Sequence, residues 1–367
     1  MRGTITAQPD FLTVINLNQC VPLNHPLRAI KTQMDAVLKK LSPQFNELYA
    51  DDGRASIPPE QLLKARVLTA LYSVRSERLF CEQLGYNLLW FLDREYGDGS
   101  FDHSVFAKNY DRVLSADVAK LFFIEVYDLS RQGGWTSDEH FTADGTLIEA
   151  WASLKSFVRK DGADEPKIQS AKDEDPGNPT INFRGEKRGN ATHQSTTDGD
   201  SVLYRKASGV TARLCFGAHA LMENRNGLCA DFTLHNPITA SEPAVALRQL
   251  DAHTELHEGV NVQTVGADKG YHRQDFVQGC RERGVAPHVA CKANTNITGL
   301  DGRTTRQQSY AVSLKIRKRV EEIFGWIKTV GGFRRSQYRG LERTQAWGYF
   351  GASTYNLLRR ARLGAAA

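Results

Sequence analysis

The sequence predicts a mixed α/β protein with a central sheet, preceded by a region built from helices alone. Through residues 1–135, apolar side chains recur at helical spacing. After Gly133 and Gly134 the pattern changes, and strand-like and helix-like segments alternate. A long amphipathic helix follows at 313–330. Together these three observations indicate a helical region followed by a sheet that is flanked by helices.

Residues 1–135 contain several apolar patterns with the period of a helix. Pro58 and Pro59 mark the start of one of them, as prolines often do in the first turn. The predicted helices cover 25–41, 57–74, 76–84, 102–114 and 116–130. We therefore expect a helical N-terminal domain over 1–135. DNA binding through a helix-turn-helix variant is a hypothesis for this domain, because other helical bundles share the same pattern.

The second predicted domain, residues 136–363, carries the sheet. Its expected strands cover 140–151, 214–224, 227–236, 261–271 and 285–290, and its expected helices cover 241–256, 272–284 and 313–330. Ser241 precedes Glu242 and Pro243, which is typical of a helix start. A polar stretch at about 155–199 is poor in apolar residues, which indicates a long loop or a partly disordered insertion.

Charge is distributed unevenly along the chain. The net charge is +5, and the pI is about 8.8. Residues 303–362 contain fourteen Lys or Arg against three Glu, a local charge of +11, so the rest of the chain carries about −6. A basic block of this kind is typical of proteins that bind phosphate groups, and a solvated basic surface is the alternative.

Composition argues against several classes of protein. Hydrophobic residues make up 41% of the chain, which suits a folded globular protein. The six cysteines form no CxxC pair, so neither a zinc site nor a disulfide framework is expected. No signal peptide opens the sequence, and no apolar run approaches the ~20 residues of a membrane span. We therefore expect a cytoplasmic protein without a membrane partner.

Two aspartates lie in or at the end of predicted strands. Asp144 precedes the flexible Gly145 in the strand at 140–151, and Asp268 ends a later strand, just before Lys269. In open α/β sheets, ligand sites form beyond the carboxyl ends of the strands. Each aspartate is therefore a candidate site residue, and capping of the next turn is the alternative for each.

Glu321 lies on the predicted helix at 313–330. With ~100° of rotation per residue, Arg317, Glu321 and Lys328 share a narrow band at the edge of the apolar stripe. Glu322 falls on the solvated side, so we expect Glu321 to turn towards the sheet. The alternative is an ordinary surface ion pair with Arg317 at the i−4 position.

The chemistry of phosphodiesters explains why three such acids should converge. Cleavage and transesterification need an activated oxygen nucleophile and a stabilised leaving group, and two divalent ions supply both. Hard cations such as Mg²⁺ prefer oxygen ligands, and no cluster of His or Cys competes for a softer metal. Neighbouring cations would hold the phosphates of DNA. The candidates are Arg317, Lys328, Lys269, Lys318 and Arg319.

The segments around these residues resemble the DDE transposases of bacterial insertion sequences, specifically the insertion-sequence-5 family. The similar segments are FTADGTLIEAWASLKS, HQSTTDGDSVLYRK, VGADKGYH and IRKRVEEIFGWIKTVGGFRR, and PPEQLLKARVLTALYSVRSERLFCEQLGYNLLWFLD resembles the family's N-terminal domain. The related superfamily has a Tyr-Arg-Glu-Lys signature spaced Y-x2-R-x3-E-x6-K, which Arg317, Glu321 and Lys328 match. Leu314 stands at the tyrosine position, so any role of that tyrosine is absent here.

The resemblance implies a ribonuclease-H-like catalytic domain in which Asp144, Asp268 and Glu321 hold two Mg²⁺ or Mn²⁺ ions. The chain would then be a DNA transposase that binds the terminal inverted repeats of an insertion sequence, cuts the DNA there and joins the freed ends to target DNA. A homodimer on DNA and an association with the bacterial nucleoid are expected on the same ground.

Two other functions stay open at this point. A transposase-derived protein could bind DNA without cutting it, and the presence of all three acids argues against that loss. A metal-dependent nuclease or phosphatase could use a similar core. The helical N-terminal region and the basic block at 303–362 favour a large DNA substrate over a small phosphate ester.

Overall fold

The protein is described by a computed structural model that covers residues 16–49, 56–85, 89–115, 117–161, 188–206, 209–257, 259–293 and 296–366. The part before the sheet is helical. Its elements are α1 (Leu17–Cys20), α2 (Pro26–Leu48), α3 (Pro59–Leu71), α4 (Glu77–Leu84), η1 (Leu89–Leu92), η2 (Tyr96–Asp98), α5 (His103–Ser115) and α6 (Val118–Gln132). Each helix predicted for 1–135 therefore has a counterpart in the structure.

Local chemistry sets where these helices begin. His25 caps α2 by accepting a hydrogen bond from the backbone amide of Leu27, and Pro26 occupies the first turn. Ser76 caps α4 in the same way through the amide of Leu79. The apolar faces then meet in one core, to which α2 contributes Ile30, Met34, Val37, Leu38 and Leu41.

A six-stranded sheet forms the second part of the molecule. Its strands are β1 (His140–Glu149), β4 (Val202–Tyr204), β5 (Arg213–Glu223), β6 (Leu228–His235), β7 (Thr264–Ala267) and β8 (Ala286–Val289). The order is β4-β5-β1-β7-β8, and β6 also pairs with β5. β5 runs antiparallel to β1 and to β6, whereas β1, β7 and β8 are parallel. The series β6-β5-β1-β7-β8 is the strand order of the ribonuclease-H-like fold, which the family resemblance implies.

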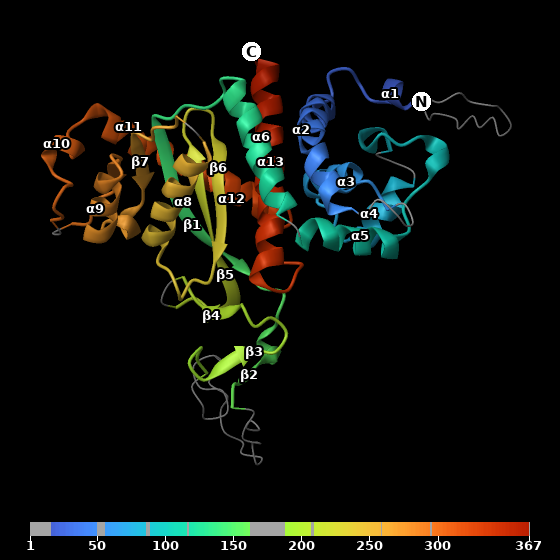
Figure 1. Cartoon of the computed structure of the whole chain (residues 1–367). Helices are drawn as coiled ribbons and strands as arrows, with labels where there is room; N and C mark the ends of the chain where they lie inside the picture. The colour runs from blue at the N-terminus through green and yellow to red at the C-terminus, as the bar shows by residue number, and fades with distance from the viewer. Residues whose placement is uncertain are drawn as a thin grey trace, which may run out of the picture.

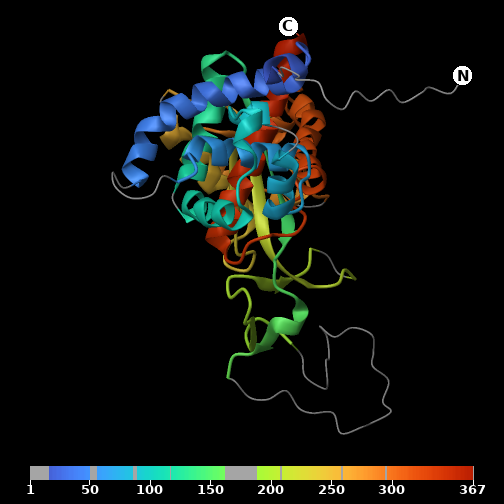
Figure 2. The ribbon, with the colours of Figure 1, turned by 90° about the vertical axis from the view of Figure 1, so that its right-hand side faces the viewer.

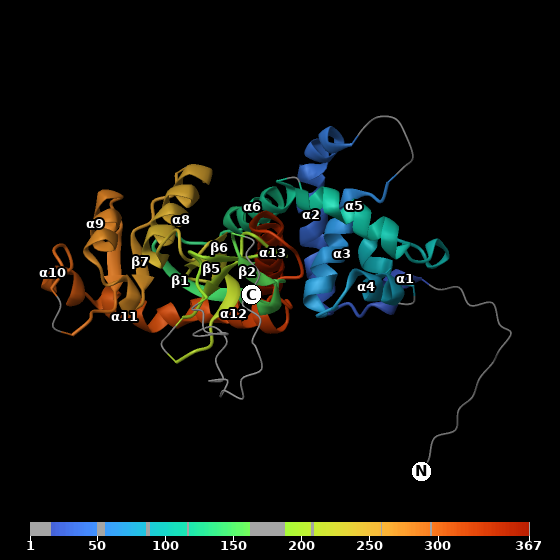
Figure 3. The ribbon, with the colours of Figure 1, turned by 90° about the horizontal axis from the view of Figure 1, so that it is seen from below.

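Helices cover both faces of this sheet (Figure 3). One face carries α8 (Glu242–Leu256) and α9 (Gln274–Glu282). The other face carries α11 (Gln308–Ile316), the 3₁₀ turn η5 (Arg317–Arg319), α12 (Val320–Thr329) and α13 (Leu341–Ala366). Side chains of β1 alternate between the two cores. Phe141 and Ala143 pack on the α8 side, and Ile148 packs on the α12 side.

The last helix, α13, connects the helical part with the sheet (Figure 1). Ala346, Phe350, Leu357 and Ala361 belong to the core of the N-terminal helices. Trp347 of the same helix belongs to the core beneath the sheet, among other residues. α13 therefore packs against both the N-terminal helices and the sheet. The boundary expected near residue 135 marks a change in the kind of secondary structure, and the two parts are packed together through α13.

A small hairpin projects from the carboxyl end of β1 (Figure 2). It consists of η3 (Leu154–Ser156) followed by β2 (Phe157–Arg159), which pairs antiparallel with β3 (His193–Ser195). The two ends of the insertion predicted at 155–199 are thus ordered strands. The middle of that insertion, 162–187, lies outside the described residues.

The remaining short elements are η4 (Lys269–Tyr271), which follows β7, and α10 (Gly302–Thr305), which precedes α11. Across the described ranges, no helix combines the length and the apolar character that crossing a bilayer would require.

Candidate active site

Asp144 and Asp268 come together because of the strand register. β1 and β7 are parallel, and Thr142 pairs with Gly266. Asp144 and Asp268 each follow two residues later, so both lie on the α11–α12 face of neighbouring strands, which are about 4.8 Å apart in a sheet. The Asp144 carboxylate accepts a hydrogen bond from the amide of Gly145 at 2.8 Å, and the Asp268 carboxylate accepts one from Gly270 at 2.7 Å.

The charge of Asp268 acts on the Asp144 carboxylate. Burial raises the pKa of Asp144, and the charge of Asp268 raises it further. The amide of Gly145 and the cations of Lys206 and Arg317 act in the opposite direction. A half-buried pair of acids is unfavourable without a counterion, so the pair is suited to bind a cation.

Two of the predicted cations lie over β1, close to this pair. Arg317 is near enough to affect the pKa of Asp144. Lys328 donates a hydrogen bond from Nζ to Oγ1 of Thr146 at 2.5 Å. Burial lowers the pKa of Lys328, and the nearby charge of Lys206 lowers it further. Thr146 lies two residues after Asp144 on the same face of β1, so Lys328 points to the same side of the sheet as the acids.

Glu321 does not turn towards the sheet as the sequence predicts. The segment expected to be one helix at 313–330 is divided into α11, η5 and α12. A 3₁₀ turn rotates by ~120° per residue instead of ~100°, so three residues shift the following side chains by about 60°. Glu321 and Glu322 are both exposed in the first turn of α12. The structure brings Asp144 and Asp268 together on neighbouring strands and leaves the side chain of Glu321 exposed to solvent.

Arg319 has a different place from the one expected of a DNA contact. Its Nη1 donates hydrogen bonds to the backbone carbonyls of Asn224 and Arg225, so it holds the turn between β5 and β6. Lys318 and Lys269 are exposed. In the run Arg317–Arg319, Arg317 therefore lies near Asp144, Lys318 is exposed, and Arg319 stabilises the turn between β5 and β6.

Sequence reasoning missed a further acid and a neighbouring lysine. Glu242 lies in the first turn of α8 and is half-buried. Burial raises its pKa, Lys206 lowers it, and the charges of Asp144 and Asp268 raise it further. Nζ of Lys206 donates to the carbonyl of Gly145 at 3.2 Å. A glutamate after an N-cap serine is typical of a helix start, so the sequence pattern does not separate Glu242 from an ordinary helix-start residue.

These side chains supply oxygen donors alone, which suits a hard divalent cation. In the residues that the structure describes, no three acidic, His or Cys side chains stand close enough to share one metal ion. Asp144 and Asp268 alone bring two carboxylates to neighbouring strands. A third carboxylate would have to approach by a change of side-chain rotamer, which exposed or half-buried glutamates can undergo.

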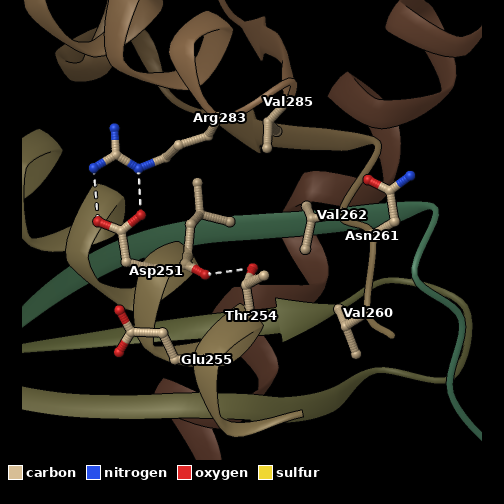
Figure 4. A pocket seen from close by; sticks show the side chains of 9 residues that line it. Asp251, Thr254, Glu255, Val260, Asn261, Val262, Arg283 and Val285 are labelled. Atoms are coloured by element: carbon tan, nitrogen blue, oxygen red, sulfur yellow. Dashed lines mark hydrogen bonds and ion pairs between the residues drawn. The ribbon is translucent and has the colours of Figure 1, made fainter. Parts of the chain in front are cut away.

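A pocket elsewhere on the sheet is separate from the acids (Figure 4). Its lining includes Leu250 and Glu255 of α8, Val262 before β7, and an ion pair between Asp251 and Arg283. The pocket lies near the amino end of β7, whereas Asp268 follows the carboxyl end. None of the predicted site residues lines it.

Comparison with protein families gives two matches. Residues 15–112 match the family described as a transposase domain (DUF772), and residues 190–357 match the transposase DDE domain. The first match covers most of the N-terminal helices. The second runs from just before β3 into α13 and includes Asp268 and Glu321, whereas Asp144 precedes it.

Solved structures give weaker likenesses. The piggyBac transposase synaptic complex with hairpin DNA is 9% identical with a TM-score of 0.41, over 95% of this chain and 77% of that one. The Mos1 paired-end complex with the left transposon end is 10% identical with a TM-score of 0.20, over 80% of this chain and 88% of that one. Likenesses at this level carry no functional inference.

No curated protein matches the sequence. The family matches still lie on both parts of the molecule, one on the helices and one on the sheet. The second match lies on a sheet with the ribonuclease-H-like strand order, in which two aspartates stand side by side on parallel strands. Enzymes with this domain depend on divalent metal ions. The chain is a DDE transposase, an enzyme that cleaves DNA and transfers the cut strand.

Proposed function

We propose that Asp144, Asp268 and Glu321 are the metal-binding acids of this transposase and that they hold two Mg²⁺ or Mn²⁺ ions. The observation that carries the proposal is the parallel register that sets Asp144 beside Asp268. Two bound ions activate the attacking oxygen and stabilise the leaving one in phosphoryl transfer. Glu321 lies in the first turn of α12, between Arg317 and Lys328 in the sequence, and would reach the pair through a change of side-chain rotamer.

We propose that the chain's own cations position the DNA. Lys328 and Arg317 lie over β1 on the side of the acids, where they would hold the phosphates on either side of the scissile bond. Lys269 and Lys318 are exposed and would contact the backbone farther out. Such contacts fix the register of the DNA without reading its sequence.

We propose that the DNA consists of the terminal inverted repeats of an insertion sequence and a target duplex. The spacing of Arg317, Glu321 and Lys328 supports a place in the insertion-sequence-5 group, despite Leu314. The helical region 1–135 would bind the repeats, and 136–363 would carry out the chemistry. Two copies of the chain would hold two ends, and a bacterial DNA substrate would place the protein with the nucleoid in the cytoplasm.

The test is cleavage of a duplex that carries the element's own terminal repeat, in the presence of Mg²⁺. Asp144→Asn, Asp268→Asn and Glu321→Gln are each expected to reduce cleavage by at least 100-fold, because each removes a ligand without changing the size of the side chain. Binding of the same duplex should persist in an electrophoretic mobility assay.

Glu322→Gln is the matched control, because Glu322 is the exposed neighbour of Glu321 and pairs with Arg359 at 3.7 Å. This variant should cleave like the unmodified chain. Undiminished cleavage by any of the three site variants would remove that residue from the metal site. Binding without Mg²⁺-dependent cleavage by the unmodified chain would instead favour a DNA-binding protein that has lost its chemistry.

A further inference from the structure

We propose that the turn between α3 and α4, residues 72–78, is a DNA-binding surface that holds the duplex as it leaves the active site. The inference rests on the proposed function, because it assigns a surface of the helical part to the same DNA. The turn carries Tyr72, Arg75 and Arg78, whose side chains are exposed. Its partner is the phosphate backbone of a duplex, to which arginine and tyrosine side chains donate hydrogen bonds.

A hydrogen bond places this turn at the end of α12. Oγ of Ser73 donates to the backbone carbonyl of Val330 at 2.7 Å, and Val330 directly follows α12. Lys328, in the last turn of the same helix, donates to Thr146, which lies two residues after Asp144 on β1. α12 therefore leads from the face of the sheet that carries the aspartates to the turn between α3 and α4 (Figure 3).

The segment that follows α12 connects the helical part with the end of β1. The hydroxyl of Tyr338 accepts a hydrogen bond from Arg66 of α3 and donates to Glu77 of α4 at 3.4 Å. Earlier in the segment, the backbone carbonyl of Arg334 accepts from the amide of Glu149, the last residue of β1. The start of α4 and the carboxyl end of β1 therefore contact the same short segment.

The charged side chains of the turn leave an excess of positive charge. Glu77 is the acid within the turn, and it forms an ion pair with the buried Arg66 at 3.6 Å. Arg75 and Arg78 form neither a hydrogen bond nor an ion pair with any residue that the structure describes, although Glu82 lies four residues after Arg78. Both guanidinium groups are therefore available to phosphate oxygens, whose geometry they match.

The backbone of the turn is held in one conformation. Ser73 has a φ of 53°, in the left-handed region that residues other than glycine rarely adopt. Such a conformation persists where surrounding contacts hold it, and it is common at binding sites. Here the hydroxyl of Ser73 is tied to Val330, and the next amide, that of Val74, donates to the carbonyl of Thr69 at 3.0 Å. A turn fixed in this way loses little entropy when it binds DNA.

The length of β1 indicates where on the DNA the turn would bind. From Asp144 to Glu149 the strand spans about 17 Å, at ~3.3 Å per residue. One turn of a duplex rises about 34 Å, so this length corresponds to roughly half a helical turn. Arg75 and Arg78 would therefore contact phosphates roughly half a helical turn away from the bond that is cut.

The test is binding of the terminal-repeat duplex by the full chain without divalent metal, measured over a range of salt concentrations. The double variant Arg75→Gln with Arg78→Gln is expected to weaken binding at least tenfold. The slope of log K against log salt concentration should become shallower by about two, because each lost phosphate contact releases about one counterion fewer. Circular dichroism checks that the variant is folded.

The matched control is Lys39→Gln with Arg248→Gln. It also removes two exposed cations, one from α2 and one from α8 on the opposite face of the sheet from α12. This variant should bind the duplex with the affinity and the salt slope of the unmodified chain. Unchanged binding by the arginine variant, weaker binding with an unchanged slope, or an equal loss in the control would each overturn the inference.

Hydroxyl-radical footprinting of the duplex shows where the contact lies. The arginine variant should lose protection roughly half a helical turn from the cut and keep it at the cut itself. A footprint identical to that of the unmodified chain contradicts the inference.

Failure of the proposed function would look different. An unmodified chain that binds through Arg75 and Arg78 but never cuts the duplex with Mg²⁺ would keep the DNA-binding surface and lose the proposed chemistry. Normal cutting by the unmodified chain, with the same affinity and footprint in the arginine variant, would remove the surface and leave the proposed function standing.

Discussion

Glu223 lies at the end of β5 with its side chain fully buried. The backbone amides of Arg225 and Asn226 donate to its two carboxylate oxygens across the turn to β6. Burial nevertheless raises the pKa of Glu223 to about 7, because the amides offset the lost hydration only in part. This acid has a structural explanation within the chain, whereas the charges of neighbouring acids contribute to the raised pKa values of Asp144 and Glu242.

The raised pKa makes the contribution of Glu223 to stability depend on pH. The folded chain holds the proton more tightly than the unfolded chain, so stability falls as the pH rises from the ordinary glutamate value of 4.5 to about 7. Glu223→Gln removes this dependence. Between pH 5 and pH 8, the unmodified chain should lose about 2 kcal/mol more unfolding free energy than the variant.

Urea unfolding of both chains at the two pH values measures this difference. Other titrating groups are common to the two chains and cancel in the comparison. An equal change in both chains would mean that Glu223 titrates normally in the folded state.

The sequence allowed the positions of Asp144 and Asp268 to be predicted, and it misplaced the side chain of Glu321. Asp144 and Asp268 were predictable because a residue within a strand, or directly after one, has its position determined by the sheet. Glu321 was projected on an uninterrupted helix, and the 3₁₀ turn η5 changed its direction. The sequence did not single out Glu242, whose raised pKa the aspartates contribute to, since many helices begin with a glutamate after a serine cap.

At the scale of elements, α13 depends on close contact with the sheet. Gly348 of α13 is buried, and a Cβ atom there would lie 2.7 Å from a ring carbon of Phe232 and 3.0 Å from Cδ1 of Leu234. Both neighbours belong to β6 and to the core. The glycine therefore allows the helix to approach the strand more closely than any other residue would.

Gly348→Ala is expected to destabilise the protein in spite of the higher helix propensity of alanine. The clash with a packed ring should cost about 1–3 kcal/mol, and the propensity gain recovers about 1 kcal/mol at most. Gly325→Ala is the matched control, because Gly325 is exposed on α12 with no atom within 4 Å of an added Cβ. Chemical denaturation should show a loss for the first variant and a small gain for the second.

An equal gain in stability in both variants would show that β6 shifts readily to accommodate a methyl group on α13.

The helix α13 itself was not predicted from the sequence, and its surroundings explain why. α13 is covered on one side by the N-terminal helices and on another by the sheet, and it buries Ser353, Thr354 and Asn356 completely. A helix enclosed in this way lacks the single apolar stripe by which surface helices are recognised.

At the scale of the whole molecule, charge counting overstated the surface available for DNA. Several cations of the block at 303–362 donate to backbone carbonyls within the chain. Arg319 binds the turn after β5, Arg335 binds the carbonyls of Ala150 and Trp151, and Arg359 binds the carbonyl of Asn226. Sequence alone cannot distinguish cations that bind backbone carbonyls within the chain from cations that are free to bind a phosphate.

The sequence pattern distinguishes the helical region clearly from the region of the sheet. In the structure the two regions are packed together through α13.

The central claim is that Asp144 and Asp268 bind the same divalent metal. Cysteine in place of an aspartate ligand replaces a hard oxygen by a softer sulfur, which disfavours Mg²⁺ more than Mn²⁺. The most direct measurement is therefore cleavage of the terminal-repeat duplex by Asp268→Cys in each metal. Asp275→Cys is the control, because Asp275 is an exposed acid that pairs with Arg273.

The account predicts that Asp268→Cys is inactive with Mg²⁺ and recovers a substantial part of its cleavage with Mn²⁺, whereas Asp275→Cys cleaves normally with both ions. Cleavage by Asp268→Cys at the unmodified rate in Mg²⁺, or the same residual rate with both ions, would contradict a metal-binding role for Asp268.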